Sequence, residues 1–535
     1  MPGKMGIPLN WEMLLNEQAR QLGDKPFLYL VYQDRYISYR EMNDNANRVA
    51  NFLLKKGYGP GDGLAMLMNN SSQYLDVFFG IQKIGMYVNT VNTSLKGDGL
   101  AYIIDNSDTR ALVVDYDLID LYRSVKNSLP KVKEVIVNTL EAPPDYIVPE
   151  GMLDLRDAYR NDIPVTRPEM VFDENSILYL MYTSGTTGLP KGVVTRYNKS
   201  RIESLKALAS FILSPESVYY TALPLFHGNA LLITTTLSMI NGSTVALSKK
   251  FSASRFWDEI RQSKATVFST LGAMIPILLK QPERPDDHEH NVVKVMSAAC
   301  PANMWEPFEK RFNVNIWEAY AAIDGTGIIA NFGSAPAGSI GIPLGVEIRI
   351  VDQEWNDVPQ GTTGELLFKV PEDRASKVEY YKNSEASEKK TRGEWEGTGD
   401  LVYQDKDGFL YFVGRNTESM RRRGENVSAY EVENAILKHP VVLECAVFGV
   451  PSELGEDEIM AVISLVEGSN LNPPDLLEFL QDKLAKFAIP RYVRIVDDFS
   501  KTETHRIKKK ELQALGVTED SYDREKQDDT VMAIL

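Results

Sequence analysis

The segment with the clearest chemical character is Thr183-Ser-Gly-Thr-Thr-Gly-Leu-Pro-Lys191-Gly192, which directly follows an apolar run at 177–182. Its glycines let backbone N–H groups turn inward, its hydroxyls add donors, and Lys191 adds a cation, a combination that binds polyphosphate. It is not the GxxxxGK[ST] loop, because no Ser or Thr follows the lysine. An ordinary polar surface loop is the alternative interpretation. We predict a phosphate-binding loop made by Thr183, Ser184, Gly185, Thr186, Thr187, Gly188 and Lys191.

The elements predicted around this loop alternate between helix and strand. Ser38 and Glu41 form a capping-box pattern that opens an amphipathic run ending at Gly57. Apolar and helical runs then alternate at 64–68, 73–84, 111–115, 116–128 and 135–137. This rhythm predicts an α/β fold of layered, largely parallel sheets.

The pattern of apolar runs and turn residues changes after about residue 335. Short apolar runs separated by Gly and Asp-Gly turns predict a β-rich subdomain over about 335–415. We therefore expect a large N-terminal domain over 1–415 that includes this subdomain. A small mobile α+β domain is expected over 416–515, followed by a polar, frayed tail over 516–535.

Composition narrows the class of protein. The chain has 535 residues, 43% apolar and 25% charged, as in soluble globular proteins. With 58 basic and 74 acidic side chains its net charge is −16, which argues against general nucleic-acid binding. Two cysteines, Cys300 and Cys445, fit a reducing compartment, and five scattered histidines predict no zinc site.

No apolar run has the length of a secretory signal or a transmembrane helix. The sequence therefore predicts a cytoplasmic protein without a transmembrane segment. Peripheral membrane contact and a homodimer are both compatible with it.

Further short motifs follow the loop in order: LPLFHG at 223–228, SAACP at 297–301, WEAYAAID at 317–324, TGD at 398–400, RRRGE at 421–425 and KTETHRIK at 501–508. With these motifs, residues from about 35 to 513 resemble the adenylate-forming superfamily of acyl-CoA synthetases, peptide-synthetase adenylation domains and luciferases. The segment 421–433 is most similar to crotonobetaine/carnitine-CoA ligases and fatty-acid transport-type ligases. The resemblance implies an AMP-forming acid–thiol ligase that activates a small carboxylic acid as acyl-AMP and transfers it to CoA, reversibly in principle, with ATP and Mg²⁺.

The resemblance also implies roles for nucleotide-binding residues. Tyr320 would stack on adenine, while Asp400 and Arg415 would reach the ribose. Asp324 stands where the family has the Mg²⁺-binding glutamate, and Ile323 replaces a threonine that contacts the AMP phosphate. Besides the loop, the implied nucleotide site comprises Ala298, Ala299, Cys300, Glu318, Ala319, Tyr320, Ile323, Asp324, Asp400, Arg415 and Arg506.

Three further groups of residues follow from the resemblance. The acyl pocket would include His227, Gly272 and Ala321, and Thr417 would be the hinge of the small domain. The CoA loop would comprise Arg421, Arg422, Arg423, Gly424 and Glu425, with the arginines binding the phosphates of CoA. A solvated charge run is the alternative interpretation of these arginines.

Arg506 replaces the family's catalytic lysine, and His505 replaces the preceding glycine. The lysine bridges the acyl carboxylate and the α-phosphate, and arginine keeps that charge with a bulkier, directional head group. Together with Lys191 and Asp324, Arg506 is therefore a predicted catalytic residue.

Three alternatives to a CoA ligase stay open from the sequence. The first is a ligase that loads a carrier protein. The second is a non-enzymatic acyl-nucleotide sensor, because Ile323, Thr417 and Arg506 all depart from the family pattern. The third is a luciferase-like oxygenase.

Overall fold

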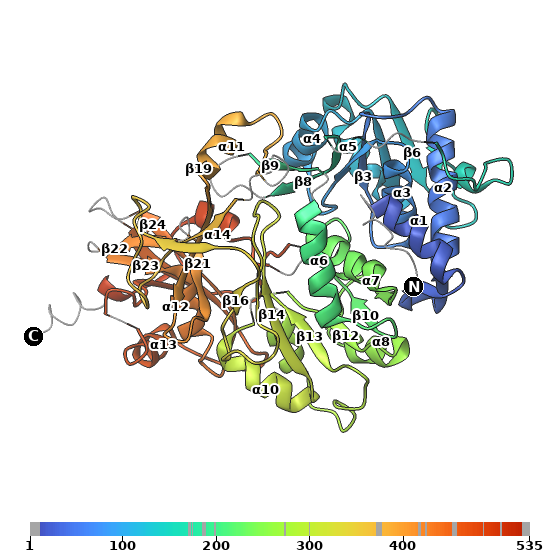
Figure 1. Ribbon diagram of the computed structural model, residues 1–535. Helices are drawn as coiled ribbons and strands as arrows, with labels where there is room; N and C mark the ends of the chain where they lie inside the picture. The colour runs from blue at the N-terminus through green and yellow to red at the C-terminus, as the bar shows by residue number, and fades with distance from the viewer. Residues whose placement is uncertain are drawn as a thin grey trace, which may run out of the picture.

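The computed structural model describes residues 11–169, 173, 175–183, 189–196, 199–271, 274–298, 300–370, 377–415, 419–422, 425–451, 457–484, 486–502 and 506–526. Two large sheets and a smaller β-rich sheet are followed by a C-terminal α+β unit (Figure 1). This is the layered α/β fold with a β-rich subdomain and a small C-terminal domain that the sequence predicts.

The first large sheet lies in the blue and cyan part of Figure 1. All of its strand pairs are parallel except the last, β8 with β9. In spatial order its strands are β7 (Leu153–Asp154), β6 (Glu134–Asn138), β5 (Ala111–Asp115), β3 (Gly63–Leu67), β4 (Tyr87–Thr90), β8 (Ile177–Thr183) and β9 (Lys191–Arg196). Strands β3, β4 and β5 are buried along their whole length, which explains their unbroken apolar runs.

The second large sheet is parallel at its centre and antiparallel at both edges. In spatial order its strands are β16 (Ile342–Pro343), β15 (Ile329–Ala330), β14 (Asn315–Tyr320), β13 (Lys294–Ser297), β12 (Val267–Ser269), β10 (Val218–Thr221), β11 (Thr244–Leu247), β1 (Pro26–Leu30) and β2 (Arg35–Ser38).

Helices cover both faces of each large sheet. One shared core joins the inner faces of the two sheets with α1 (Trp11–Leu22), α2 (Tyr39–Lys55), α3 (Ser72–Gln82), α8 (Phe256–Ser263), α9 (Met274–Leu279) and α10 (Ala302–Phe312). The outer faces are covered by α4 (Gly97–Asn106) and α5 (Ile119–Val125) on the first sheet, and by α6 (Lys199–Ile212) and α7 (Thr236–Asn241) on the second. Short 3₁₀ segments are η1 (Val31–Gln33), η2 (Tyr116–Leu118), η3 (Lys126–Ser128) and η4 (Leu155–Tyr159).

Local sequence signals explain several of these boundaries. The hydroxyl of Ser38 accepts a hydrogen bond from the Glu41 N–H at 3.1 Å, so the predicted cap opens α2. The helical run predicted at 116–128 is divided into η2, α5 and η3. The described helices include none with the length and apolar character needed to cross a bilayer.

The β-rich subdomain is an antiparallel sheet with one short helix. It contains β17 (Ile348–Val351), β18 (Gly364–Lys369), β19 (Thr391–Arg392), β20 (Trp395–Gln404) and β21 (Leu410–Arg415), together with α11 (Ser384–Lys390).

The C-terminal unit, orange to red in Figure 1, packs helices on both faces of a four-stranded sheet. Its strands are β22 (Ser419–Arg422), β23 (Glu425–Ser428), β24 (Val442–Pro451), β25 (Asp457–Leu465), β26 (Tyr492–Ile495) and β27 (Tyr522–Asp523), of which β22 and β23 form a separate hairpin. Its helices are α12 (Ala429–Ile436), α13 (Pro473–Leu480) and α14 (Lys509–Leu515).

The prediction of a frayed tail from residue 516 is wrong for its first part. Strand β27 pairs with β26, and Arg491 forms ion pairs with Asp523 at 3.1 Å and with Glu525 at 3.0 Å. The acidic residues of this segment, whose polarity suggested a frayed tail, are the ion-pair partners of Arg491. The boundaries at 415 and 515 stay predictions.

Candidate active site

The predicted phosphate-binding loop lies in the sequence between β8 and β9, which pair at the edge of the first large sheet. Thr183 at the end of β8 pairs with Lys191 at the start of β9, and the Thr183 hydroxyl donates to the Lys191 carbonyl oxygen at 3.5 Å. The other predicted loop residues, Ser184, Gly185, Thr186, Thr187 and Gly188, lie outside the described residues. The loop follows the carboxyl end of β8, the edge at which open α/β sheets bind ligands.

A segment before α11 continues this sheet edge. The Val194 N–H donates to the Glu379 carbonyl at 2.9 Å, and the Tyr381 N–H donates to the Gly192 carbonyl at 2.7 Å. This pairing holds Tyr380 beside Lys191, whose Nζ lies 5.0 Å from the centre of the tyrosine ring. The β-rich subdomain is thereby fixed next to the phosphate loop.

Four side chains form what we call the lysine–aspartate cluster: Lys191, Tyr380, Asp324 and Lys390. The Tyr380 hydroxyl donates to Asp324 Oδ2 at 2.6 Å, and Lys390 Nζ lies 3.2 Å from the same oxygen. Burial acts to raise the pKa of Asp324, but the Lys390 charge and the Tyr380 hydrogen bond outweigh it and hold this pKa below its ordinary value. The cluster therefore keeps the Asp324 carboxylate ionised beside Lys390, with Lys191 on the ring of Tyr380.

Asp400, the predicted ribose partner, occupies a buried position between Tyr320 and Arg415. The Tyr320 hydroxyl donates to Asp400 Oδ2 at 2.5 Å, and Arg415 Nε lies 3.0 Å from Oδ1. Burial raises the pKa of Asp400, although Arg415 and the Tyr320 hydrogen bond oppose this. Strands β20 and β21 pair Asp400 directly with Arg415, so the sheet register sets this contact.

The turn after β13 lies against the end of β14. Ser297 pairs with Glu318 across the two strands, and the Cys300 N–H donates to Glu318 Oε2 at 3.4 Å. Cys300 and Glu318 are both buried, and burial raises the pKa of the Cys300 thiol. Ala299 lies outside the described residues. The small side chains keep this turn open toward the cavity described next.

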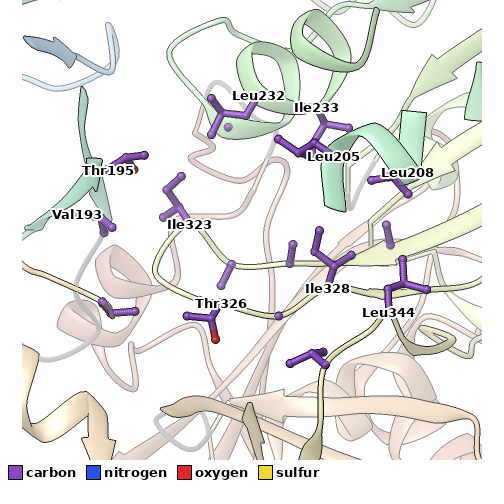
Figure 2. A pocket seen from close by; sticks show the side chains of 18 of the residues that line it. Val193, Thr195, Leu205, Leu208, Leu232, Ile233, Ile323, Thr326, Ile328 and Leu344 are labelled. Carbon is purple, nitrogen blue, oxygen red and sulfur yellow. The ribbon is translucent and has the colours of Figure 1, made fainter. Parts of the chain in front are cut away.

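A cavity of about 960 Å³ joins the predicted acyl and nucleotide residues. Its lining includes six of them: His227, Ala298, Ala319, Ala321, Ile323 and Arg506. Burial, assisted by the charge of Arg506, lowers the pKa of His227 to about 4. Figure 2 shows that apolar side chains from α6, from the π-helix η5 (Asn229–Thr235) and from the segment after β14 point into this cavity. Gly272 lies outside the described residues, next to the lining residue Leu271.

Arg506 reaches this cavity from the C-terminal unit, while the other five residues belong to the second large sheet and its loops. Lys280, just after α9, donates from Nζ to the backbone carbonyls of Val442 (3.1 Å) and Leu443 at the start of β24. Arg506 therefore lines the cavity from the C-terminal unit, which Lys280 also joins to the side of the molecule that holds the second large sheet.

The expectation that Arg422 binds CoA phosphates does not fit its position. Its side chain is 1% exposed, its Nε lies 2.7 Å from Glu458 Oε2, and its Nη1 donates to the Phe487 and Ile489 carbonyls. Residues two apart on a strand face the same side, so Arg422 points inward like the buried Met420. In the β22–β23 hairpin Arg421 pairs with Asn426 and Glu425 with Arg422. Thr417, Arg423 and Gly424 lie outside the described residues.

Sequence reasoning missed Tyr380 and Lys390. Lys390 belongs to the run SEASEKK, which has the composition of a solvated helix, and Tyr380 stands in no pattern that predicts an active-site contact. Both reach Asp324 only because segment 379–381 pairs with β9. No sequence signal encodes that long-range pairing.

Comparisons with known proteins agree with this geometry. The family model described as AMP-binding enzyme matches residues 15–372, and the model described as AMP-binding enzyme C-terminal domain matches residues 431–506. Crotonobetaine/carnitine–CoA ligases of Salmonella paratyphi B and Salmonella typhimurium are each 30% identical over 518 residues, which cover 94% of this chain and 98% of the relative.

Two solved structures share the fold over nearly the whole chain. An anthranilate–CoA ligase in complex with anthranoyl-AMP has a TM-score of 0.83 at 26% identity, covering 95% of this chain and 98% of that one. A benzoate–CoA ligase from Burkholderia xenovorans has a TM-score of 0.80 at 23% identity, covering 94% of this chain and 99% of that one, and shows the fold alone.

Proposed function

Because the chain belongs to the AMP-binding enzyme family and is an acid–thiol ligase, we propose that it activates a small carboxylic acid with ATP and then transfers the acyl group to CoA. The observation that carries this proposal is the position of Arg506. It lies in the cavity lined by His227, Ala298 and Ala321, where a carboxylate and an α-phosphate would meet.

In the first step, a carboxylate oxygen of the acid attacks the α-phosphorus of ATP. The bond from that phosphorus to the bridging oxygen breaks, and pyrophosphate leaves. Positioning and charge stabilisation do most of the work in such a transfer. Lys191 and the loop that it closes face the leaving phosphates, Arg506 stabilises charge at the reacting groups, and Asp400 accepts from the ribose.

The second step transfers the acyl group. The sulfur of CoA attacks the acyl carbon, the bond from that carbon to the phosphate oxygen breaks, and AMP leaves while the thiol proton passes to solvent. His227 is uncharged at neutral pH, so it offers the acyl group a polar but neutral neighbour.

The lysine–aspartate cluster fits a bound Mg²⁺. Asp324 stays ionised, and the buried Glu396 lies close enough for their charges to interact. The described residues contain no group of three or more side chains that could hold a metal ion by themselves. Mg²⁺ usually takes one or two carboxylates plus substrate phosphates, so Asp324 would hold it together with ATP. When bound, the ion would neutralise phosphate charge.

The two half-reactions measured separately test the proposal. Arg506→Ala should slow acyl-AMP formation by roughly a hundredfold, the low end for loss of one such electrostatic contact, and leave acyl-AMP plus CoA turnover largely intact. Arg506→Lys should retain activity, because the positive charge is kept. Lys508→Ala is the control, since Lys508 lies at the surface 3.2 Å from Glu511. Unchanged adenylation in Arg506→Ala would contradict the assignment.

A carrier-protein acceptor is the second candidate. The burial of Arg422 removes one of the groups that the sequence assigned to CoA. AMP release from supplied acyl-AMP should depend on CoA with saturation. Release that responds to a phosphopantetheinylated carrier protein and not to CoA would favour carrier loading.

A further inference from the structure

The acyl side of the cavity is built from aliphatic side chains on facing elements. Leu205 and Leu208 of α6 lie opposite Ile328 and Leu344, with Leu232 of η5 beside them (Figure 2). Gly228 adds no side chain, and a Cβ there would lie 3.6–3.9 Å from its nearest neighbours, Leu232, Ile323 and Met181. This part of the wall offers contact surface and no charge.

The charged groups of the described lining are mostly basic or already paired. The basic residues are Arg196, Lys369, Lys377 and Arg506, and the acidic ones are Glu347 and Glu394. Lys369 lies 3.1 Å from Glu347 and 3.8 Å from Glu394, so both carboxylates have a cation beside them. Arg196 in turn lies 2.9 Å from Glu379, so this cation also has a counter-charge beside it.

The aromatic side chains of the lining pack against other aromatic rings. Trp11 contacts Tyr179 edge-on, with ring centres 5.8 Å apart, and Tyr179 is fully buried. Trp11 makes a second edge contact with Phe78 at 6.3 Å. A quaternary ammonium is bound by open aromatic faces or by carboxylates, and the described lining presents neither in unpaired form.

We propose that the acyl site takes a compact acid with an uncharged apolar body, branched or cyclic, and discriminates against acids that carry a cationic tail. This inference rests on the proposed function, since it describes the acid that the ligase activates. An apolar tail gains burial against the leucines and isoleucines. A cationic tail would lose its hydration against this wall, whose aliphatic side chains supply no counter-charge.

A pair of acids that differ only in charge tests this inference on the unmodified protein. Crotonobetaine carries a trimethylammonium group, and its carbon isostere carries a tert-butyl group of the same shape. Pyrophosphate release with ATP and CoA should favour the isostere by roughly a hundredfold or more in kcat/KM. If neither acid turns over, their inhibition constants against an accepted acid should rank in the same order. Equal values, or a preference for crotonobetaine, would overturn the inference.

A charge placed in the apolar wall gives a second readout. Ile328→Asp should shift the ratio of the two acids toward crotonobetaine by roughly tenfold or more, because it supplies a counter-charge. Ile328→Asn is the matched control with similar shape and no charge, and it should leave the ratio close to that of the parent. A ratio that moves equally in both variants would contradict the electrostatic explanation.

The outcomes also separate this inference from the proposed function. If no acid in a broad panel releases pyrophosphate, the proposed ligase activity fails. If acids are activated but the cationic acid is preferred, only the substrate class fails.

Discussion

Lys389 and Lys390 are neighbours in α11 with different surroundings. Lys389 is 75% exposed and pairs with Glu385 on the helix surface, whereas Lys390 is 13% exposed and lies 3.2 Å from Asp324. We expect Lys390→Met to lower kcat/KM for ATP in adenylation at least roughly tenfold, because one cation beside the phosphates is lost. Lys389→Met should change it less than about twofold, as for a surface ion pair. Equal effects of the two variants on ATP-dependent pyrophosphate release would remove Lys390 from the site.

His227 should contribute a pH dependence to stability. Its pKa is about 4 in the folded chain and 6.5 when unperturbed, so between these values the unfolded chain binds more protons. Stability conferred by neutral His227 is therefore fully present above pH 6.5 and is lost as pH falls toward 4, by roughly 3 kcal/mol in all. In urea unfolding across this range, the stability of the parent should fall more steeply with decreasing pH than that of His227→Gln, by up to roughly 3 kcal/mol. Parallel curves would refute the shift.

At the residue scale, a sequence motif predicts a site residue where it fixes the local backbone. The motif TGD placed Asp400, and the sheet register then explains its contact with Arg415. Tyr380 and Lys390 escape such prediction, because their role depends on the pairing of segment 379–381 with β9. The sequence shows that Arg506 departs from the family pattern. It does not show that the Arg506 side chain lines the cavity.

At the scale of elements, side chains alternate between the two faces of β22, and this alternation places Arg422 on the buried face with Met420. Arg422→Met should destabilise the C-terminal unit by up to about 3–5 kcal/mol, because the buried Glu458 would lose its 2.7 Å partner and keep the longer 3.9 Å contact to Arg491. The double variant Arg422→Met/Glu458→Gln should recover part of this loss. Chemical unfolding of each variant measures the effect. A neutral Arg422→Met accompanied by a raised KM for CoA would instead restore the phosphate-binding interpretation.

Ala321, directly after β14, is predicted to limit the length of the acyl site. Its side chain lines the cavity at a position where the resemblance expects glycine. Ala321→Gly should improve longer acids, and Ala321→Trp should leave only the smallest acids as substrates. A chain-length series in the pyrophosphate assay checks this. Palmitate as the best substrate of the parent would contradict the pocket assignment.

At the scale of the whole molecule, sequence periodicity predicts the layers but not how the C-terminal unit meets them. The alternation of helix and strand reproduces the two large sheets, because each element must bury one face. The contact between Lys280 and β24 joins residues about 160 positions apart, which local patterns do not encode. Arg506 lines the cavity in this arrangement.

Lys280 should therefore bias the balance between the two half-reactions. Burial lowers its pKa to about 8, and its Nζ donates to the carbonyls of Val442 and Leu443 across the two units. Lys280→Met removes these hydrogen bonds and should disfavour the arrangement that brings Arg506 to the cavity. Acyl-AMP formation should fall several-fold, while thioester formation from supplied acyl-AMP should stay constant or rise.

Lys294 is the matched control for this prediction. Its Nζ also donates to two backbone carbonyls, those of Phe211 (2.9 Å) and Ile212 (3.0 Å), but both lie within the large domain. Lys294→Met should lower stability by about 1–3 kcal/mol, the cost of leaving such carbonyls unsatisfied, without changing the ratio of the two half-reactions. Because the two variants remove the same kind of hydrogen bond, a difference between their ratios isolates the contact between the units. If Lys280→Met and Lys294→Met shift the ratio equally, the lysine acts on general stability, and the arrangement of the C-terminal unit is held by other contacts.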